Sequence, residues 1–105
     1  MKPVRFHDAA RAEFVHEVLH YATISPRLGE RLAAAVEQAV RLASEFPNMG
    51  LPYRHGTRRV FPKRFPFSLV YLVVRESEVY VLALAPFSRK PGYWRLRRGH
   101  DPIEP

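Results

Sequence analysis

Apolar residues in the first half of the chain recur with the spacing of α-helices. Residues 9–23 predict one helix, because their apolar side chains fall on one half of a helical wheel: Ala10, Phe14, Val15, Val18, Leu19, Tyr21 and Ala22. The polar side chains of this segment fall on the other half: Glu13, His16, Glu17 and His20. Asp8 is expected to cap the helix, since its carboxylate can accept hydrogen bonds from free amides of the first turn.

A second helical pattern begins at Ser25-Pro26, a capping side chain followed by proline at the first helical position. Its apolar residues keep the helical period as far as Pro47: Leu28, Leu32, Ala35, Val36, Ala39, Val40, Ala43 and Phe46. Only residues 24–25 separate the two patterns. The sequence therefore predicts an antiparallel helical hairpin.

Shorter apolar runs outside the helices have the character of β-strands. Residues 4–7 predict an opening strand, and residues 57–62, 67–75 and 78–85 predict three more. A short turn over residues 75–78 joins the last two strands as a hairpin, and residues 47–56, rich in Pro, Gly and Asn, predict a loop. Both faces of segment 67–75 are apolar, so this strand should be central and covered on both sides.

This order of elements predicts an α+β fold of the type β-α-α-β-β-β, with the helical hairpin packed on one face of a small, mostly antiparallel sheet. The 105 residues fit one domain, which we assign to residues 1–100, followed by a loose tail over residues 101–105. No apolar run approaches the ~18–20 residues that span a bilayer, and the first residues lack the apolar core of a signal peptide. The absence of cysteine suits the reducing cytoplasm.

The positive charge of the chain is concentrated in its second half. Residues 1–46 hold six Lys or Arg and six Asp or Glu, whereas residues 47–105 hold eleven basic and four acidic residues. The whole net charge of +7 therefore lies after residue 46. Such a field attracts a polyanion such as nucleic acid, or an acidic protein partner, although it can also serve solubility alone.

One short motif has the spacing of a metal site, but its position on the predicted helix argues against metal binding. The segment His16-Glu17-Val18-Leu19-His20 matches H-E-x-x-H, which on a helix can place two imidazoles on one Zn²⁺. Here both histidines fall opposite the apolar stripe and should face water, and His7, His55 and His100 have no spacing that suggests a third ligand. We therefore interpret the motif as a solvated helix face, and the sequence implies no metal and no other cofactor.

Two basic clusters are the candidate functional residues. The first surrounds the strand after the loop: Arg58, Arg59, Lys63 and Arg64. The second lies in the basic and aromatic stretch 86–98: Arg89, Lys90, Tyr93, Trp94 and Arg95. Arginine can bind phosphate or carboxylate with two parallel hydrogen bonds, and aromatic rings can stack on a base. A lone Trp near a chain end more often caps the core, and we favour that role for Trp94 while leaving Tyr93 open.

The chain resembles the RelE/ParE superfamily of toxins from type II toxin–antitoxin modules. The resemblance rests on the order of elements and on four segments: Ser25-Pro26-Arg27-Leu28-Gly29-Glu30-Arg31, Arg58-Arg59-Val60, Lys63-Arg64-Phe65-Pro66-Phe67, and Arg89-Lys90-Pro91-Gly92-Tyr93-Trp94. Together these features span nearly the whole chain. The resemblance implies a small basic protein that a cognate antitoxin wraps and holds inactive.

The superfamily implies two different activities. RelE-like members cut mRNA on the ribosome, and that resemblance would assign Arg59, Arg64 and Arg89 as cations and Tyr93 as the acid or base. ParE-like members instead inhibit DNA gyrase by binding. Related sequences often carry His just after the last strand, where this chain has Pro86.

The missing histidine decides which activity we expect. We take His7, His16, His20 and His55 to lie in other parts of the fold, and the ending Pro91-Gly92-Tyr93-Trp94 favours the ParE-like class. The sequence therefore predicts a gyrase-binding toxin rather than an enzyme. The alternative is a RelE-like mRNA endoribonuclease that acts on ribosome and mRNA. A third hypothesis is a member of the superfamily without toxic activity, which binds only its antitoxin and contacts DNA through that complex.

Overall fold

The computed structural model describes residues 2–75 and 78–100. These residues form two long helices and five strands: β1 (Val4–Phe6), α1 (Asp8–Ile24), α2 (Pro26–Glu45), β2 (Leu51–Pro52), β3 (Arg58–Val60), β4 (Phe67–Val74) and β5 (Glu78–Pro86). Apart from β2, they follow the predicted order. Two 3₁₀ turns, η1 (Arg54–Gly56) and η2 (Arg95–His100), complete the fold. The α+β architecture is confirmed. The centre of the predicted 75–78 turn and the predicted tail lie outside the described residues.

Strand β2 was not predicted, and the prediction of only a loop over residues 47–56 was wrong. It pairs antiparallel with β3 through Leu51 opposite Arg59 and Pro52 opposite Arg58. Two residues that include a proline carry no alternating pattern, and proline is tolerated at the edge of a sheet, where β2 lies. The pairing extends the sheet to five strands in the order β1-β5-β4-β3-β2. Strand β1 pairs parallel with β5, and every other neighbouring pair is antiparallel.

The first helix is capped one residue earlier than expected. His7 is the N-cap, and its Nδ1 accepts a hydrogen bond from the backbone N–H of Ala9 at 3.0 Å. Asp8 is instead the first helical residue, where its negative charge still favours the positive end of the helix dipole. The predicted cap of α2 is confirmed, since Ser25 Oγ accepts from the N–H of Leu28 at 3.3 Å.

The helical hairpin brings its two helices close together at a glycine. A Cβ added to Gly29 would lie 2.9 Å from the Cβ of Ala22 and 3.0 Å from the carbonyl oxygen of Val18. The absence of a side chain therefore offsets the lower helix propensity of glycine, because it allows α2 to approach α1.

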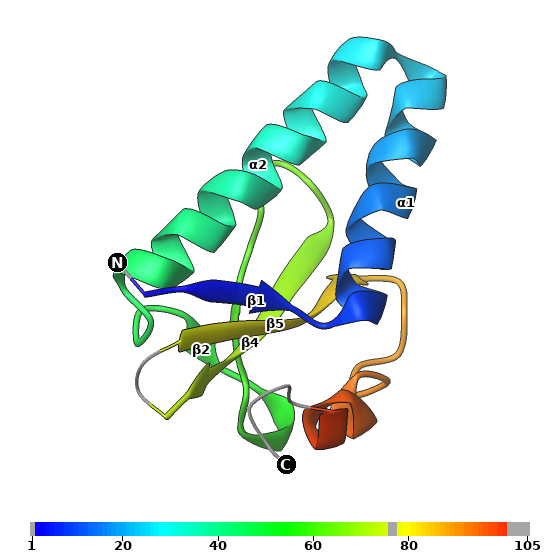
Figure 1. The fold of residues 1–105 in the computed structure, drawn as a ribbon. Helices are drawn as coiled ribbons and strands as arrows, with labels where there is room; N and C mark the ends of the chain where they lie inside the picture. Colours follow the sequence, from blue (N-terminus) through cyan, green and yellow to red (C-terminus); the bar gives the residue numbers. More distant parts are fainter. Residues whose placement is uncertain (1, 76–77, 101–105) are drawn as a thin grey trace.

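Both faces of the central strands are covered, as the sequence predicted (Figure 1). The helices cover one face, where the core is formed by Leu32, Val36, Ala39, Ala43, Phe67, Leu69, Tyr71, Val79, Val81 and Leu84. The carboxyl-terminal segment covers the other face, where Trp94 packs with Val70, Tyr80, Leu82, Ala83 and Tyr53. Trp94 is only 1% exposed, so the predicted core-capping role of this ring is confirmed.

The apolar side of α1 is wider than its contact with the core. Val15 and Leu19, predicted on the buried half of the helix, are 52% and 62% exposed. They stand one turn apart on the same side of α1 and form an apolar surface that the domain itself leaves uncovered. No helix among the described residues is long and apolar enough to cross a membrane.

Candidate binding site at the end of strand β5

The candidate site begins with an irregularity in β5. Tyr71 of β4 pairs with Val81 and the preceding Val70 pairs with Ala83, so Leu82 has no partner and forms a β-bulge. The extra residue changes which residues face the helices, from Val79 and Val81 before the bulge to Leu84 after it. It also changes which backbone groups of β5 point away from β4.

Strand β1 ends where the bulge begins, and side chains replace it beyond that point. Phe6 is the last paired residue of β1, opposite Val81. Farther along the edge, Arg97 Nη1 donates to the carbonyl oxygen of Leu82 at 2.8 Å, and the N–H of Leu84 donates to Glu13 Oε1 at 3.2 Å. Glu13 and Arg97 thus satisfy backbone groups that a longer β1 would otherwise have paired.

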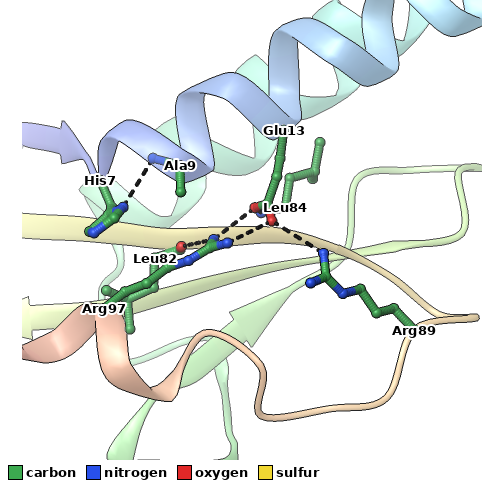
Figure 2. Close-up of polar contacts among 7 residues, drawn as sticks. All are labelled: His7, Ala9, Glu13, Leu82, Leu84, Arg89 and Arg97. Atoms are coloured by element: carbon green, nitrogen blue, oxygen red, sulfur yellow. Dashed lines mark hydrogen bonds and ion pairs between the residues drawn. The ribbon is translucent and has the colours of Figure 1, made fainter.

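Glu13 and Arg97 also bind each other through two parallel hydrogen bonds (Figure 2). Arg97 Nη1 lies 3.0 Å from Glu13 Oε1, and Nη2 lies 3.0 Å from Oε2. The two side chains are only 18% and 16% exposed, so water screens the pair weakly. Residues 84 positions apart therefore join α1 to η2, and we call this pair the Glu13–Arg97 clasp.

Tyr93 lies between two arginines beside the clasp. The guanidinium carbon of Arg89 lies 3.5 Å from the centre of its ring, and that of Arg97 lies 5.1 Å away. The hydroxyl is buried, and no residue in the described part of the chain pairs with it in good hydrogen-bond geometry. Burial, followed by the negative charge of Glu13, raises the pKa of Tyr93 well above that of free tyrosine despite both arginines.

A small pocket of about 220 Å³ opens on the same face of the sheet. Aromatic, proline and basic side chains form most of its lining: Tyr53, Arg59, Ser68, Ala85, Pro86, Phe87, Arg89, Pro91 and Trp94. The guanidinium of Arg59 lies over Tyr53, 4.0 Å from the ring centre, and Tyr53 in turn stacks on Trp94 at 5.4 Å. We call this cavity the Arg59–Arg89 pocket.

The two cations of the pocket are held mainly by aromatic rings and one hydroxyl, with only a long contact to a carboxylate. Arg59 Nη1 donates to Ser68 Oγ at 3.3 Å, and no acidic side chain in the described part of the chain forms an ion pair with Arg59. Arg89 reaches Glu13 Oε2 only at 3.9 Å, the outer limit of an ion pair (Figure 2). Positive charge at this pocket is therefore fixed in place but poorly neutralised.

The first basic cluster does not act as one unit. Arg58 Nη1 donates to the carbonyl oxygens of Asn48 at 3.2 Å and Gly50 at 2.7 Å, which secures the 47–50 turn. Lys63 and Arg64 line a different cavity of about 470 Å³ beside α2, with Arg31 and Phe65 among the other lining residues.

The second basic cluster is also divided by the structure. Lys90 and Arg95 are exposed, and Arg95 Nη1 donates to the carbonyl oxygen of Gly92 at 3.3 Å. Of the four residues proposed for RNA cleavage, only Arg59 and Arg89 line the same pocket, while Tyr93 contacts Arg89. Arg64 is placed elsewhere.

The histidines give one confirmation and two corrections. His16 and His20 are exposed, as predicted. In residues 2–75 and 78–100, no three potential metal ligands lie close enough together to hold an ion. His20 and His55 were expected to lie apart from the carboxyl-terminal segment, and this was wrong. His20 lines a cavity together with Pro86, Phe87 and Ser88. A Cβ built on Gly92 would be 3.1 Å from His55 Nε2, so η1 and the 91–94 turn meet in space. His55 does not line the Arg59–Arg89 pocket.

Glu13, Arg97 and Tyr53 are important residues that the sequence did not identify. Glu13 lies on the polar side of the helical wheel, and nothing local distinguishes it from Glu17. Arg97 is one of several arginines in a basic run, and Tyr53 lies in the predicted loop. The only signal was indirect. Because the predicted first strand is short, backbone groups of the strand beside it need hydrogen-bond partners from elsewhere in the chain.

Residues 4–91 match the family model for the ParE toxin of the type II toxin–antitoxin system parDE. The chain belongs to the ParE toxin family. This membership implies a cognate antitoxin as partner. The match ends at Pro91, so Tyr93, Trp94 and Arg97 lie beyond it.

The fold is also similar to that of a solved structure. A chain of the chromosomal ParDE toxin–antitoxin system from P. aeruginosa aligns with a TM-score of 0.71 and 22% sequence identity. The alignment covers 82% of this chain and 96% of that one. A search of curated proteins finds no match.

Proposed function

We propose that this ParE-family chain is a cytoplasmic toxin that inhibits DNA gyrase by binding, and that its cognate antitoxin neutralises it. The carrying observation is the composition of the Arg59–Arg89 pocket. Its lining combines two cations with rings, prolines and one serine, and includes no histidine or carboxylate. Cleavage of RNA requires a group that removes the proton from the ribose hydroxyl, whereas binding requires none.

The state of Tyr93 supports the same conclusion. A tyrosine must lose its proton to act as a base, and burial beside Glu13 raises the pKa of Tyr93 far from neutrality. Glu13 is no substitute, because both of its carboxylate oxygens already accept hydrogen bonds from Arg97. The cations are therefore suited to holding an anionic group of a target.

Two surfaces on the helical hairpin suit an antitoxin segment. Val15 and Leu19 form the uncovered apolar surface of α1. The cavity beside α2 joins apolar side chains, among them Leu28 and Phe65, to a basic rim that includes Arg31. An amphipathic segment with acidic residues would match both the apolar surface and the positive charge.

One observation favours the alternative, a RelE-like mRNA endoribonuclease. His55 lies against Gly92, next to Tyr93, and an imidazole is the commonest biological acid or base. A shift of this turn on the ribosome would be needed to bring His55 to the pocket. The alternative therefore predicts that His55 is essential to toxicity, which the gyrase proposal does not.

The deciding experiment tests both targets with the same proteins. The purified chain is added to a gyrase supercoiling assay and, separately, to translating ribosomes. Dose-dependent inhibition of supercoiling with intact mRNA supports the proposal, and Arg89→Ala should weaken it. mRNA cleavage that is lost in His55→Ala or Tyr93→Phe would replace the proposal with the nuclease. No effect in either assay would leave a chain that only binds its antitoxin and, through it, DNA.

A further inference from the structure

The Arg59–Arg89 pocket has the size and the chemistry of a site for one side chain. Its volume of about 220 Å³ lies below the ~300–1,000 Å³ of typical small-molecule sites. Its walls are mostly rings and proline, which match methylene groups. The polar side chains that line it are Arg59, Arg89 and Ser68 together with Tyr53 and Trp94, so N–H donors outnumber acceptors.

Two side chains that line the pocket also carry buried N–H groups. Arg59 Nε and Trp94 Nε1 are both buried, and neither has an acceptor in the described part of the chain. Arg59 has no ion pair in the described part of the chain, Arg89 has only the 3.9 Å contact with Glu13, and the two buried N–H dipoles add to their positive field, so the region favours an anion. The rings of Tyr53 and Tyr93 keep both guanidinium groups in place, so little order has to be created when an anion arrives.

An apolar ledge borders the pocket. Phe61 and Phe87 are exposed and meet edge to face, with ring centres 6.0 Å apart. Phe87 lines the pocket, and Arg59 lies 4.9 Å from the ring centre of Phe61. A ligand that reaches the cations can therefore also bury an apolar group on these two rings.

We infer that the Arg59–Arg89 pocket binds the carboxylate of a Glu or Asp side chain from a partner polypeptide, with a neighbouring apolar residue of that segment on the Phe61–Phe87 ledge. A single carboxylate on a short apolar stem fits a pocket too small for a nucleotide. The inference rests on the proposed function in one respect, that the ligand of this toxin is a protein.

The single tryptophan of the chain provides the assay, since Trp94 lines the pocket. Its fluorescence is followed while acetyl-Glu-Phe-amide is added, with the uncharged acetyl-Gln-Phe-amide as matched control. The Glu peptide should bind saturably and at least about tenfold more tightly, as expected for hydrogen bonds to a charged group. Because gyrase is absent, the result is independent of any supercoiling measurement.

Variants assign the binding to named residues. Arg89→Gln and Arg59→Gln should each weaken binding of the Glu peptide about tenfold or more. Arg27 is an exposed arginine of α2, and Arg27→Gln removes the same charge away from the pocket, so it should change the affinity less than about twofold. Arg89 is more than half exposed, so its variant should fold even if that of Arg59 does not. Phe87→Ala should weaken the binding of acetyl-Glu-Phe-amide more than the binding of acetyl-Glu-Ala-amide.

Three results would overturn the inference. Equal affinity for the Glu and Gln peptides would show that no carboxylate is recognised. Tighter binding of inorganic phosphate or of a single-stranded oligonucleotide would assign the pocket to phosphate instead. No saturable change up to the solubility limit of the Glu peptide would show that the pocket is not a ligand site.

Discussion

Replacing Glu13 by glutamine tests whether the Glu13–Arg97 clasp holds the carboxyl-terminal segment on the sheet. The glutamine oxygen can still accept from the N–H of Leu84, but the negative charge opposite Arg97 is lost. Removing one partner of a buried ion pair typically costs ~3–5 kcal/mol, because a charge is left buried and unpaired. The side chains of Glu13 and Arg97 are still 18% and 16% exposed. We therefore expect a loss of unfolding free energy at the low end of this range, about 3 kcal/mol.

Urea unfolding of the full chain measures this cost, and the chain offers a matched control. Glu17, one turn after Glu13 on α1, forms no ion pair in the described part of the chain. Glu17→Gln makes the same chemical change without breaking an ion pair and should therefore cost no more than about 1 kcal/mol. A cost of about 3 kcal/mol is a large part of the ~5–15 kcal/mol that stabilises a typical domain, so the transition of Glu13→Gln should move clearly.

A double-mutant cycle separates the clasp from general loss of packing. Glu13→Gln, Arg97→Gln and the double variant should give a coupling energy of at least about 1 kcal/mol, as expected for residues in direct contact. The reasoning is refuted if Glu13→Gln costs no more than Glu17→Gln. It is equally refuted if the two clasp substitutions add to within about 0.5 kcal/mol.

Three further predictions follow from individual contacts. Gly92→Ala should destabilise the fold by about 1 kcal/mol or more, measured by thermal unfolding, because Gly92 has φ +92° and a Cβ would press on His55. Gly50→Ala should cost about 1–3 kcal/mol in the same assay, since its Cβ would overlap the Tyr71 hydroxyl that donates to Pro47, whereas Tyr71→Phe in the Gly50→Ala background should recover part of the loss. Because burial raises the pKa of Tyr93, the folded state keeps a proton that the unfolded chain loses above about pH 10, so stability should fall there. The fall in urea midpoint between about pH 9 and 11 should be smaller in Tyr93→Phe, and an equal fall would contradict the assignment.

The sequence predicted the parts of the fold that have a regular period and failed where structure depends on single contacts. Helix α2 and strands β4 and β5 were found because each buries a repeating set of apolar residues. His7 was missed as the cap of α1, because Asp8 is chemically the stronger candidate, yet Asp8 is already inside the helix. Val15 and Leu19 were placed in the core because a helical wheel shows which residues share a side, not how far the neighbouring sheet extends.

The candidate site could be predicted as a composition but not as a geometry. Arg58 and Arg59 are adjacent in sequence, yet consecutive residues of a strand point to opposite faces. Arg58 pairs with Tyr71 and shares its helix-facing side, whereas Arg59 pairs with Val70 and shares the side of Trp94. The sequence grouped the two arginines because it could not show the register.

The same consideration explains why the arginines of the carboxyl-terminal segment serve different purposes. Arg97 is committed to the fold, since it makes two 3.0 Å contacts with Glu13 and one of 2.8 Å with Leu82. Arg89 shares that carboxylate only at 3.9 Å, and Glu13 has already satisfied its charge with Arg97. Exchanging this long contact for a ligand carboxylate in the Arg59–Arg89 pocket costs little, because exposed or distant ion pairs contribute little to stability. The clasp therefore leaves Arg89 available for a ligand while Tyr93 keeps it in position.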